Sequence, residues 1–158
     1  MLTPTLPVSN DPQVLKTRLN EIFRVIFAEL QSIRELIPED YMAIKISKRL
    51  VDGSQLTTGA ATYYTTPANT RTKIEACVLT NTSGANRTVT MHLVPSGGSA
   101  SASNRILSAY TVNAGASYSV DEAINQVLET GGTLQALSDG ATAVSLVASG
   151  SEYFTRPS

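Results

Sequence analysis

Residues 12–37, PQVLKTRLNEIFRVIFAELQSIRELI, carry the strongest structural pattern in this chain. Seven apolar residues recur at gaps of 4, 3, 4, 4, 3 and 4, a repeat of about 3.67 residues per turn. They form a nearly straight row on one helix face: Leu15, Leu19, Ile22, Ile26, Leu30, Ile33 and Ile37. Phe23 and Phe27 flank this row and widen it. We call these nine residues the apolar face, and we expect it to be an interface.

The two ends of this helix are marked by residues that favour helix termini. Asn10 or Asp11 can cap it, and Pro12 suits its first position, where a missing N–H costs nothing. Pro38 stops it, so we predict a helix over residues 12–37, about 39 Å long at 1.5 Å per residue. Its apolar face could pack on the chain's own C-terminal domain, on copies of itself around a threefold axis, or in a groove of a larger assembly.

Residues 1–11 precede the helix as an arm interrupted by prolines. Pro4 and Pro7 exclude helix there and favour an extended backbone. The arm has neither the basic start nor the apolar centre of a signal peptide, so we expect the chain to be made in a cytoplasm. The arm and the helix together are the predicted attachment or oligomerisation segment.

From residue 41 onward the apolar pattern changes to a period of two, which is typical of half-buried strands. In the strand expected at 72–81, Ile74, Ala76 and Val78 fall on one face, and Cys77 falls on the other. The expected strands are 42–47, 61–65, 72–81, 87–94, 105–112, 117–120, 133–137 and 142–149. Short strands at even spacing predict a mainly β domain over residues 41–158, a β-sandwich or jelly roll preceded by one long N-terminal helix.

Three connections in this domain carry their own predictions. Residues 95–104, rich in Ser and Gly, read as a long flexible loop. Residues 121–128 read either as a short helical turn or as a loop. The Ser138-Asp139-Gly140 segment predicts a hairpin that pairs 133–137 with 142–149, because Asp-Gly between alternating apolar runs favours a tight turn.

Composition excludes several kinds of partner. The chain has 12 basic and 13 acidic residues and a net charge of −1, which gives no general attraction to nucleic acid or to an anionic membrane. One cysteine excludes an intramolecular disulfide. No run of eighteen apolar residues is present, so we expect no transmembrane helix.

The residues that could support catalysis are few. His92 is the single histidine and falls on the polar face of its strand, and Cys77 has no residue nearby to activate it. Asp121 and Glu122 are adjacent carboxylates, which are usually solvated or capping residues; a glycosidase would need a partner at a defined distance. We therefore predict no catalytic, metal or cofactor site, and no enzyme.

Three basic residues, Lys45, Lys48 and Arg49, lie close together just after the helix. They read as a solvated strand face or as a contact with an acidic partner subunit.

Several turn and strand-end segments of the β-rich region resemble those of a known class of proteins. These are YYTTPANT at 63–70, IEACVLTNTS at 74–83, VTMHLVPSGG at 89–98 and NRIL at 104–107. In this order they resemble small β-sandwich domains in virion proteins of tailed bacteriophages. The resemblance covers about residues 60–150 and leaves the helix outside it. It implies the fold and a virion context, and it carries over no functional residue.

The resemblance and the helix together predict a non-enzymatic structural protein of a phage virion. We expect it on the capsid exterior, as a decoration (cement) protein or a head fibre, bound to the major capsid protein through the arm and helix. The alternative is a trimeric neck, tail or baseplate appendage that binds neck or tail proteins. Recognition of a host surface by loop 95–104 would require exposed aromatic residues, and that loop has none.

Overall fold

The computed structural model describes residues 11–36 and 44–154, with side chains described at 11–33 and 44–154. The chain divides into two compact units, Met1–Met42 and Ala43–Ser158, and we describe each by itself. Three parts of the predictions lie outside the described residues: residues 1–10 of the arm, the last helical residue Ile37, and the strand start at Met42.

The N-terminal unit contains the predicted long helix. α1 spans Pro12–Leu36, 25 residues. Asp11 caps its start: the backbone N–H of Gln13 donates to Asp11 Oδ1 at 2.8 Å, and the N–H of Leu15 donates to the Asp11 carbonyl at 3.0 Å. The first bond satisfies an N–H group that a helix start otherwise leaves open, and the second is the first regular hydrogen bond of the helix.

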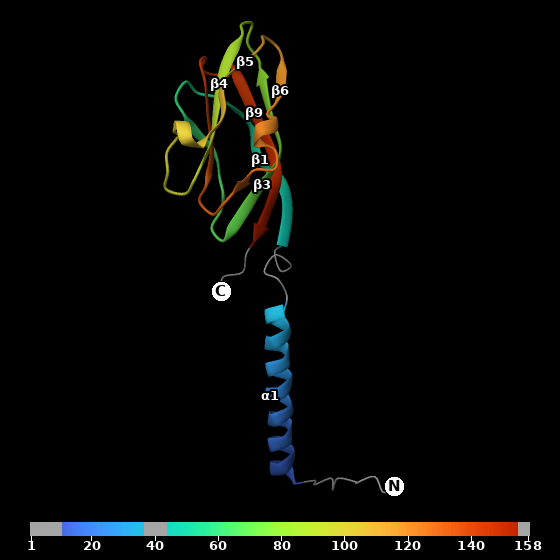
Figure 1. The fold of residues 1–158 in the computed structure, drawn as a ribbon. Helices are drawn as coiled ribbons and strands as arrows, with labels where there is room; N and C mark the ends of the chain where they lie inside the picture. Colours follow the sequence, from blue (N-terminus) through green and yellow to red (C-terminus); the bar gives the residue numbers. More distant parts are fainter. Residues whose placement is uncertain (1–10, 37–43, 155–158) are drawn as a thin grey trace. The chain divides into compact units, whose positions relative to one another are not determined.

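The C-terminal unit, named here the β-domain, consists of two antiparallel sheets (Figure 1). The first has the order β1-β9-β3-β6, with β7 paired to β3, and the second has the order β2-β8-β4-β5. The first sheet is formed by β1 (Ile44–Gln55), β3 (Thr70–Asn81), β6 (Ser117–Ser119), β7 (Val127–Leu128) and β9 (Val144–Phe154). The second is formed by β2 (Ala61–Thr65), β4 (Arg87–Val94), β5 (Arg105–Val112) and β8 (Thr133–Ser138).

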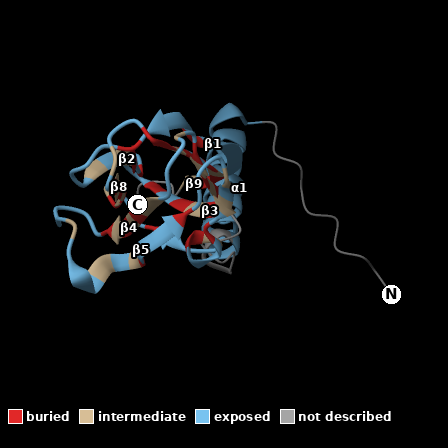
Figure 2. Ribbon diagram, turned by 90° about the horizontal axis from the view of Figure 1, so that it is seen from above, coloured by how far each residue is buried: buried red, intermediate tan, exposed pale blue. Residues whose placement is uncertain are grey.

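This strand order is that of a jelly roll, in which the chain crosses repeatedly between two packed four-stranded sheets; β7 is a short addition. The predicted fold class, a mainly β sandwich or jelly roll with one N-terminal helix, is confirmed. Apolar side chains fill the space between the sheets, and the largest fully buried ones are Leu56, Ile74, Leu79, Met91, Leu134 and Leu146. Figure 2 shows buried residues, in red, along strands of both sheets.

The first strand is longer than predicted. The expected strand ended at residue 47, whereas β1 continues to Gln55 and buries Leu50 and Val51 side by side. The pairing of β1 with β9 shifts register between Arg49 and Val51 and again between Asp52 and Ser54. A β-bulge places two residues opposite one, so the period of two is lost where the strand continues.

A bulge in β3 reverses the faces predicted for the rest of that strand. Its pairing with β9 shifts register between Ile74 and Ala76. Ile74 is buried as expected, but beyond the shift Cys77 and Leu79 face the core while Ala76 is exposed. The prediction that Ala76 and Val78 share the face of Ile74 was therefore wrong, because one extra residue moves every later side chain to the other face.

The predicted Asp-Gly hairpin is also wrong. β8 pairs with β2 and β4, whereas β9 pairs with β1 and β3, so the turn at Asp139 and Gly140 connects the two sheets. Its flanking backbone groups bond elsewhere: the Ser138 N–H donates to Thr57 O, and the Thr142 N–H donates to Leu56 O. Both flanking strands alternate as hairpin strands do, because each has one face on the shared core.

Candidate functional site

The apolar face of α1 is exposed in the structure. Its eight described residues have exposed fractions between 47 and 64%: Leu15, Leu19, Ile22, Phe23, Ile26, Phe27, Leu30 and Ile33. Ile37, the ninth predicted member, lies outside the described residues. Val25 borders this face and is 58% exposed. Contiguous exposed apolar surface of this kind marks a binding surface, so this helix face is the candidate functional site.

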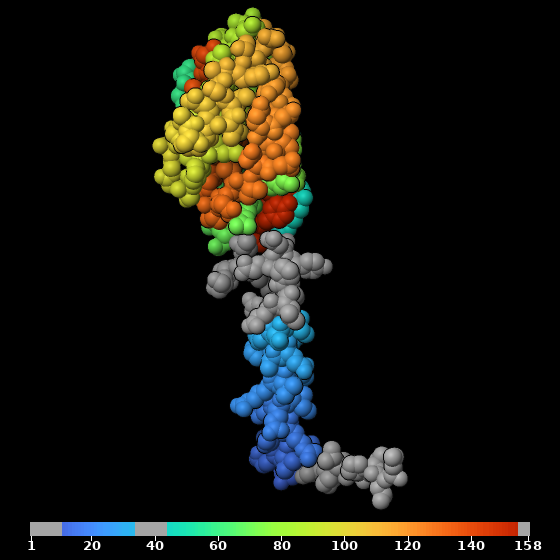
Figure 3. Space-filling view, in the orientation of Figure 1, coloured from blue at the N-terminus to red at the C-terminus, as the bar shows by residue number. Residues whose placement is uncertain are grey.

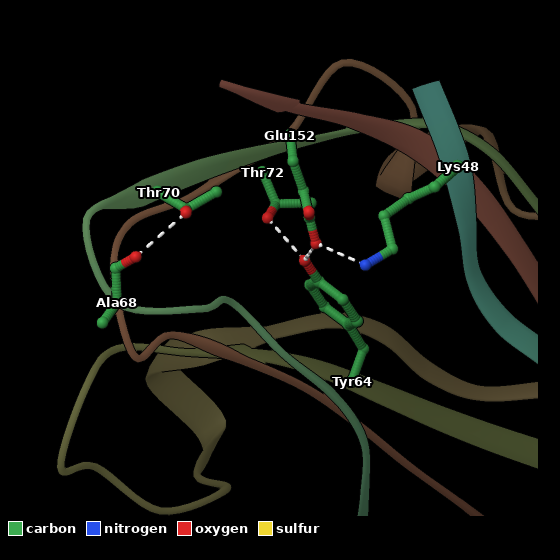
Figure 4. Close-up of polar contacts among 6 residues, drawn as sticks. All are labelled: Lys48, Tyr64, Ala68, Thr70, Thr72 and Glu152. Carbon is green, nitrogen blue, oxygen red and sulfur yellow. Dashed lines mark hydrogen bonds and ion pairs between the residues drawn. The ribbon is translucent and has the colours of Figure 1, made fainter. Parts of the chain in front are cut away.

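The β-domain contains one buried charged cluster that the sequence analysis missed. Glu152, on β9, is 3% exposed. Its Oε1 accepts a 2.7 Å hydrogen bond from the Tyr64 hydroxyl and lies 3.0 Å from Lys48 Nζ (Figure 4). The same hydroxyl lies 2.7 Å from Thr72 Oγ1. Tyr64 belongs to one sheet and the other three residues belong to the opposite one, so the cluster joins the two sheets.

The Tyr64 phenol stays protonated in this cluster. Burial, together with the Glu152 carboxylate, raises the pKa of Tyr64 to about 12. The phenol is therefore a hydrogen-bond donor at neutral pH, and Glu152 is a paired carboxylate whose charge is balanced by Lys48. The sequence signal was a single charged residue within the apolar alternation of 144–154, a position where an unpaired charge would be costly.

The three basic residues at the start of the β-domain each have an acidic partner within the same chain. Lys45 Nζ lies 3.2 Å from Glu75 Oε1, and Arg49 Nε lies 3.7 Å from Asp52 Oδ1. Lys48 pairs with Glu152, as described above. These pairs favour the interpretation of this patch as a solvated strand face.

His92 lies on the outer face of its sheet, as predicted, but it is 3% exposed. The loop 95–104, yellow in Figure 3, forms part of the surface of the β-domain. Within it, the Ser101 carbonyl and Asn104 Oδ1 each lie 3.0 Å from His92 Nδ1. Both partners are acceptors, so Nδ1 carries the proton. The loop is thus tied to His92 rather than free, and the role of this histidine is structural.

The other candidates for chemistry are also placed by the structure. Cys77 is fully buried, and burial raises the pKa of its thiol to about 12, so a reactive thiolate is disfavoured. Asp121 and Glu122 are exposed beside a short 3₁₀ turn, Asp121–Ala123, and accept hydrogen bonds from Ser119 and Tyr118. Neither lies in the apolar pocket that a glycosidase acid requires.

Within 11–36 and 44–154, no three His, Cys, Asp or Glu side chains lie together as metal ligands would. No described helix combines the length and apolar character needed to span a membrane.

Comparisons with known proteins add structural likenesses only. No protein-family model and no curated protein sequence matches the chain. Among solved structures, one of Bacillus endospore appendages, described as disulfide-linked pili, is similar with a TM-score of 0.47 and 14% identity, over 74% of this chain and 94% of that one.

Infectious bursal disease virus supplies two more similar structures. The Gx strain gives a TM-score of 0.43 at 14% identity, over 72% of this chain and 33% of the viral one. The VP2 subviral particle gives 0.35 at 18% identity, over 72% and 33%. These compared structures come from pili and virus particles. At TM-scores below 0.5 they assign no function to this chain.

Proposed function

We propose that this chain is a non-enzymatic structural protein of a tailed-phage virion. It attaches to the capsid exterior, as a decoration (cement) protein or a head fibre, through the arm at 1–11 and the helix at 12–37. The β-domain is the module that this segment holds on the particle.

The observation that carries the proposal is the contrast between the two units. The β-domain fills its own core with side chains between Leu50 and Ala148, so it needs no partner to bury them. α1 instead presents a continuous apolar face with about half of each side chain in water. A helix of this kind gains most of its stability from packing that face against other protein.

The chemistry of the β-domain fits this role. Its one buried carboxylate, Glu152, is paired with Lys48 and with the Tyr64 hydroxyl, and all three hold the sheets together. The turn and strand-end segments within residues 60–150 support the virion context by resemblance.

The proposal can be tested on purified particles of the phage that carries this gene. Labelling with antibodies against the β-domain, viewed by electron microscopy, should mark the capsid surface. The double variant Ile22→Asp with Ile26→Asp should be lost from purified particles, because two buried charges disrupt the helix contact. The matched control, Glu21→Ala with Arg24→Ala on the polar side of α1, should be retained.

Two other results would contradict the proposal in different ways. Label on the neck, tail or baseplate would establish the alternative appendage and overturn capsid attachment. Particles that contain none of the chain would overturn the virion role altogether.

A further inference from the structure

Two tyrosines stack on each other at one edge of the β-domain. Tyr110 lies on β5 and Tyr118 on β6, which are the last strands of two different sheets. Their ring centroids are 3.9 Å apart, and the angle between the ring planes is 23°. Tyr110 pairs with the buried Val89, and Tyr118 pairs with the buried Leu79. Both rings therefore face the space between the sheets and close this edge of the sandwich.

The position of Tyr110 depends on a strained backbone. Ser108 and Ala109 of β5 both lie opposite Thr90 of β4, which is a β-bulge. Ala109 has a φ of 45°, in the left-handed region that residues other than glycine rarely adopt. The bulge brings Tyr110 to Tyr118, yet Tyr110 stays 38% exposed. Backbone strain of this kind is concentrated at sites that bind ligands, so it indicates a function for the exposed ring.

Two carboxylates lie beside the tyrosine pair. The 3₁₀ turn Asp121–Ala123 follows β6, orange in Figure 1, and contacts β5. The Tyr118 hydroxyl donates to Glu122 Oε2 at 3.4 Å, and the Ser119 hydroxyl donates to Asp121 Oδ1 at 3.0 Å. Partial burial and the charge of Glu122 raise the pKa of Tyr118, so its hydroxyl remains a donor.

Asp121 and Glu122 differ from most acidic residues of the β-domain, because neither forms an ion pair with any residue that the structure describes. Four other carboxylates of this domain each have a basic partner in the chain: Asp52, Glu75, Glu129 and Glu152. Two adjacent negative charges therefore lie next to an exposed aromatic ring without a cation to balance them.

We propose that Tyr110, Tyr118, Asp121 and Glu122, named here the edge site, bind an arginine side chain of a partner protein. The guanidinium lies on the exposed part of Tyr110 and directs its N–H groups at the two carboxylates. The face of an aromatic ring attracts a cation, and a carboxylate accepts charge-assisted hydrogen bonds. Arginine suits both contacts, because its planar group stacks on aromatic rings and carries five N–H donors.

The edge site goes beyond the proposed function. It belongs to the β-domain and uses no residue of the arm or of α1, so it gives the chain a second contact surface. Its partner is identified by charge: a positively charged side chain fits two unpaired carboxylates, whereas an acidic surface would be repelled.

NMR titration of the full-length chain with a blocked peptide, one arginine between two alanines, tests this inference. We expect saturable shifts of the ring signals of Tyr110 and Tyr118 and of no other tyrosine. Tyr110→Ala should weaken binding by about threefold, because the cation loses the ring. Asp121→Asn with Glu122→Gln should weaken it by about fivefold or more, because two exposed charge contacts are lost.

Two controls isolate the charge and its place. Asp52→Asn with Glu129→Gln also removes two carboxylates, but these already pair with Arg49 and Arg71, so binding should be unchanged. Citrulline in place of the arginine of the peptide keeps its shape without its charge and should abolish the shifts. Circular dichroism checks that every variant keeps the β-domain folded.

Three results would overturn the edge site as an arginine site. The first is the absence of saturable shifts at the two rings, and the second is an equal loss of affinity in the control variant. The third is a neutral oligosaccharide, such as maltotriose, that shifts the same rings when the arginine peptide does not, because the edge would then bind a sugar.

Discussion

The contact between the two sheets depends on one hydroxyl group, that of Tyr64. It donates to Glu152 and lies within hydrogen-bond distance of Thr72, and all three residues are buried. We expect Tyr64→Phe to lower the free energy of unfolding by about 1–3 kcal/mol, because the buried Glu152 carboxylate loses a donor. Urea unfolding followed by circular dichroism measures this loss. Unchanged stability would mean that Lys48 alone satisfies the carboxylate.

The pKa of the same phenol predicts a dependence of stability on alkaline pH. It is near 10 for an ordinary tyrosine and about 12 in the fold, so the folded state binds the proton more tightly. The stabilisation is therefore complete below pH 10 and is lost as the pH rises from 10 to 12. We expect the free energy of unfolding of Tyr64→Phe to fall less steeply than that of the wild type in this window. If the free energy of unfolding fell equally with pH in the wild type and in Tyr64→Phe, this prediction would be wrong.

The burial of Cys77 predicts that its thiol is unreactive in the folded protein. Burial raises the pKa of its thiol from 9.0 to about 12, which lowers the thiolate fraction at pH 8 by about a thousandfold. We expect the folded protein to be inert to Ellman's reagent and the urea-unfolded protein to react with one equivalent. Rapid reaction without denaturant would show that the core around β3 opens readily.

At the scale of the strand, Gly150 is fixed by its closeness to a neighbouring backbone. A Cβ at this position of β9 would collide with the carbonyl oxygen of Lys73 on β3 and would meet Leu50 Cδ1 at 3.0 Å. The carbonyl belongs to the sheet and cannot move away freely. We expect Gly150→Ala to cost about 2–3 kcal/mol or more in urea unfolding.

Gly59→Ala is the control for that prediction, because a Cβ there has no neighbour within 4 Å. Its stability should stay within about 0.5 kcal/mol of the wild type. Equal effects of the two substitutions would point to a general cost of replacing glycine, and the close approach at Gly150 would not be needed to explain either.

Regular elements of this chain could be predicted from the sequence, and irregular ones could not. α1 and β8 follow one apolar period from end to end, so the pattern of their residues predicts which side chains share a face. β1 and β3 instead shift register where they pair with β9, at Leu50 and Gly53 in β1 and at Glu75 in β3. Such a bulge is set by the partner strand, which lies about a hundred residues from β1 and about seventy-five from β3 along the chain. The spacing of apolar residues within β1 or β3 therefore gives no information about the pairing with β9.

The same reason explains the turn at Asp139 and the burial of His92. The turn residues favour a reversal of the chain, but which sheet receives the next strand depends on the whole topology. His92 was placed on the correct face of β4, whereas its burial comes from the loop that carries Ser101 and Asn104. The apolar face of α1 could be predicted, because its residues recur at helical spacing within one continuous segment. The protein that this face contacts is a proposal.

At the scale of the whole molecule, the two units have separate sources of stability. The core cluster contains side chains between Leu50 and Ala148 and none of the described side chains of α1, which end at Ile33. A single amphipathic helix of 25 residues is marginal in water without a partner for its apolar face. We therefore expect two thermal transitions, one for the helix and one for the β-domain.

The variant Ile22→Asp with Ile26→Asp separates these transitions. It should leave the midpoint of the β-domain within about 2 °C of the wild type, because no core contact is removed. Calorimetry measures this midpoint. A β-domain midpoint that falls with the helix would show that the apolar face packs on the chain's own sheets. In that case one copy would bury its own helix, and the apolar face would not be available for the attachment to another protein that the proposed function requires.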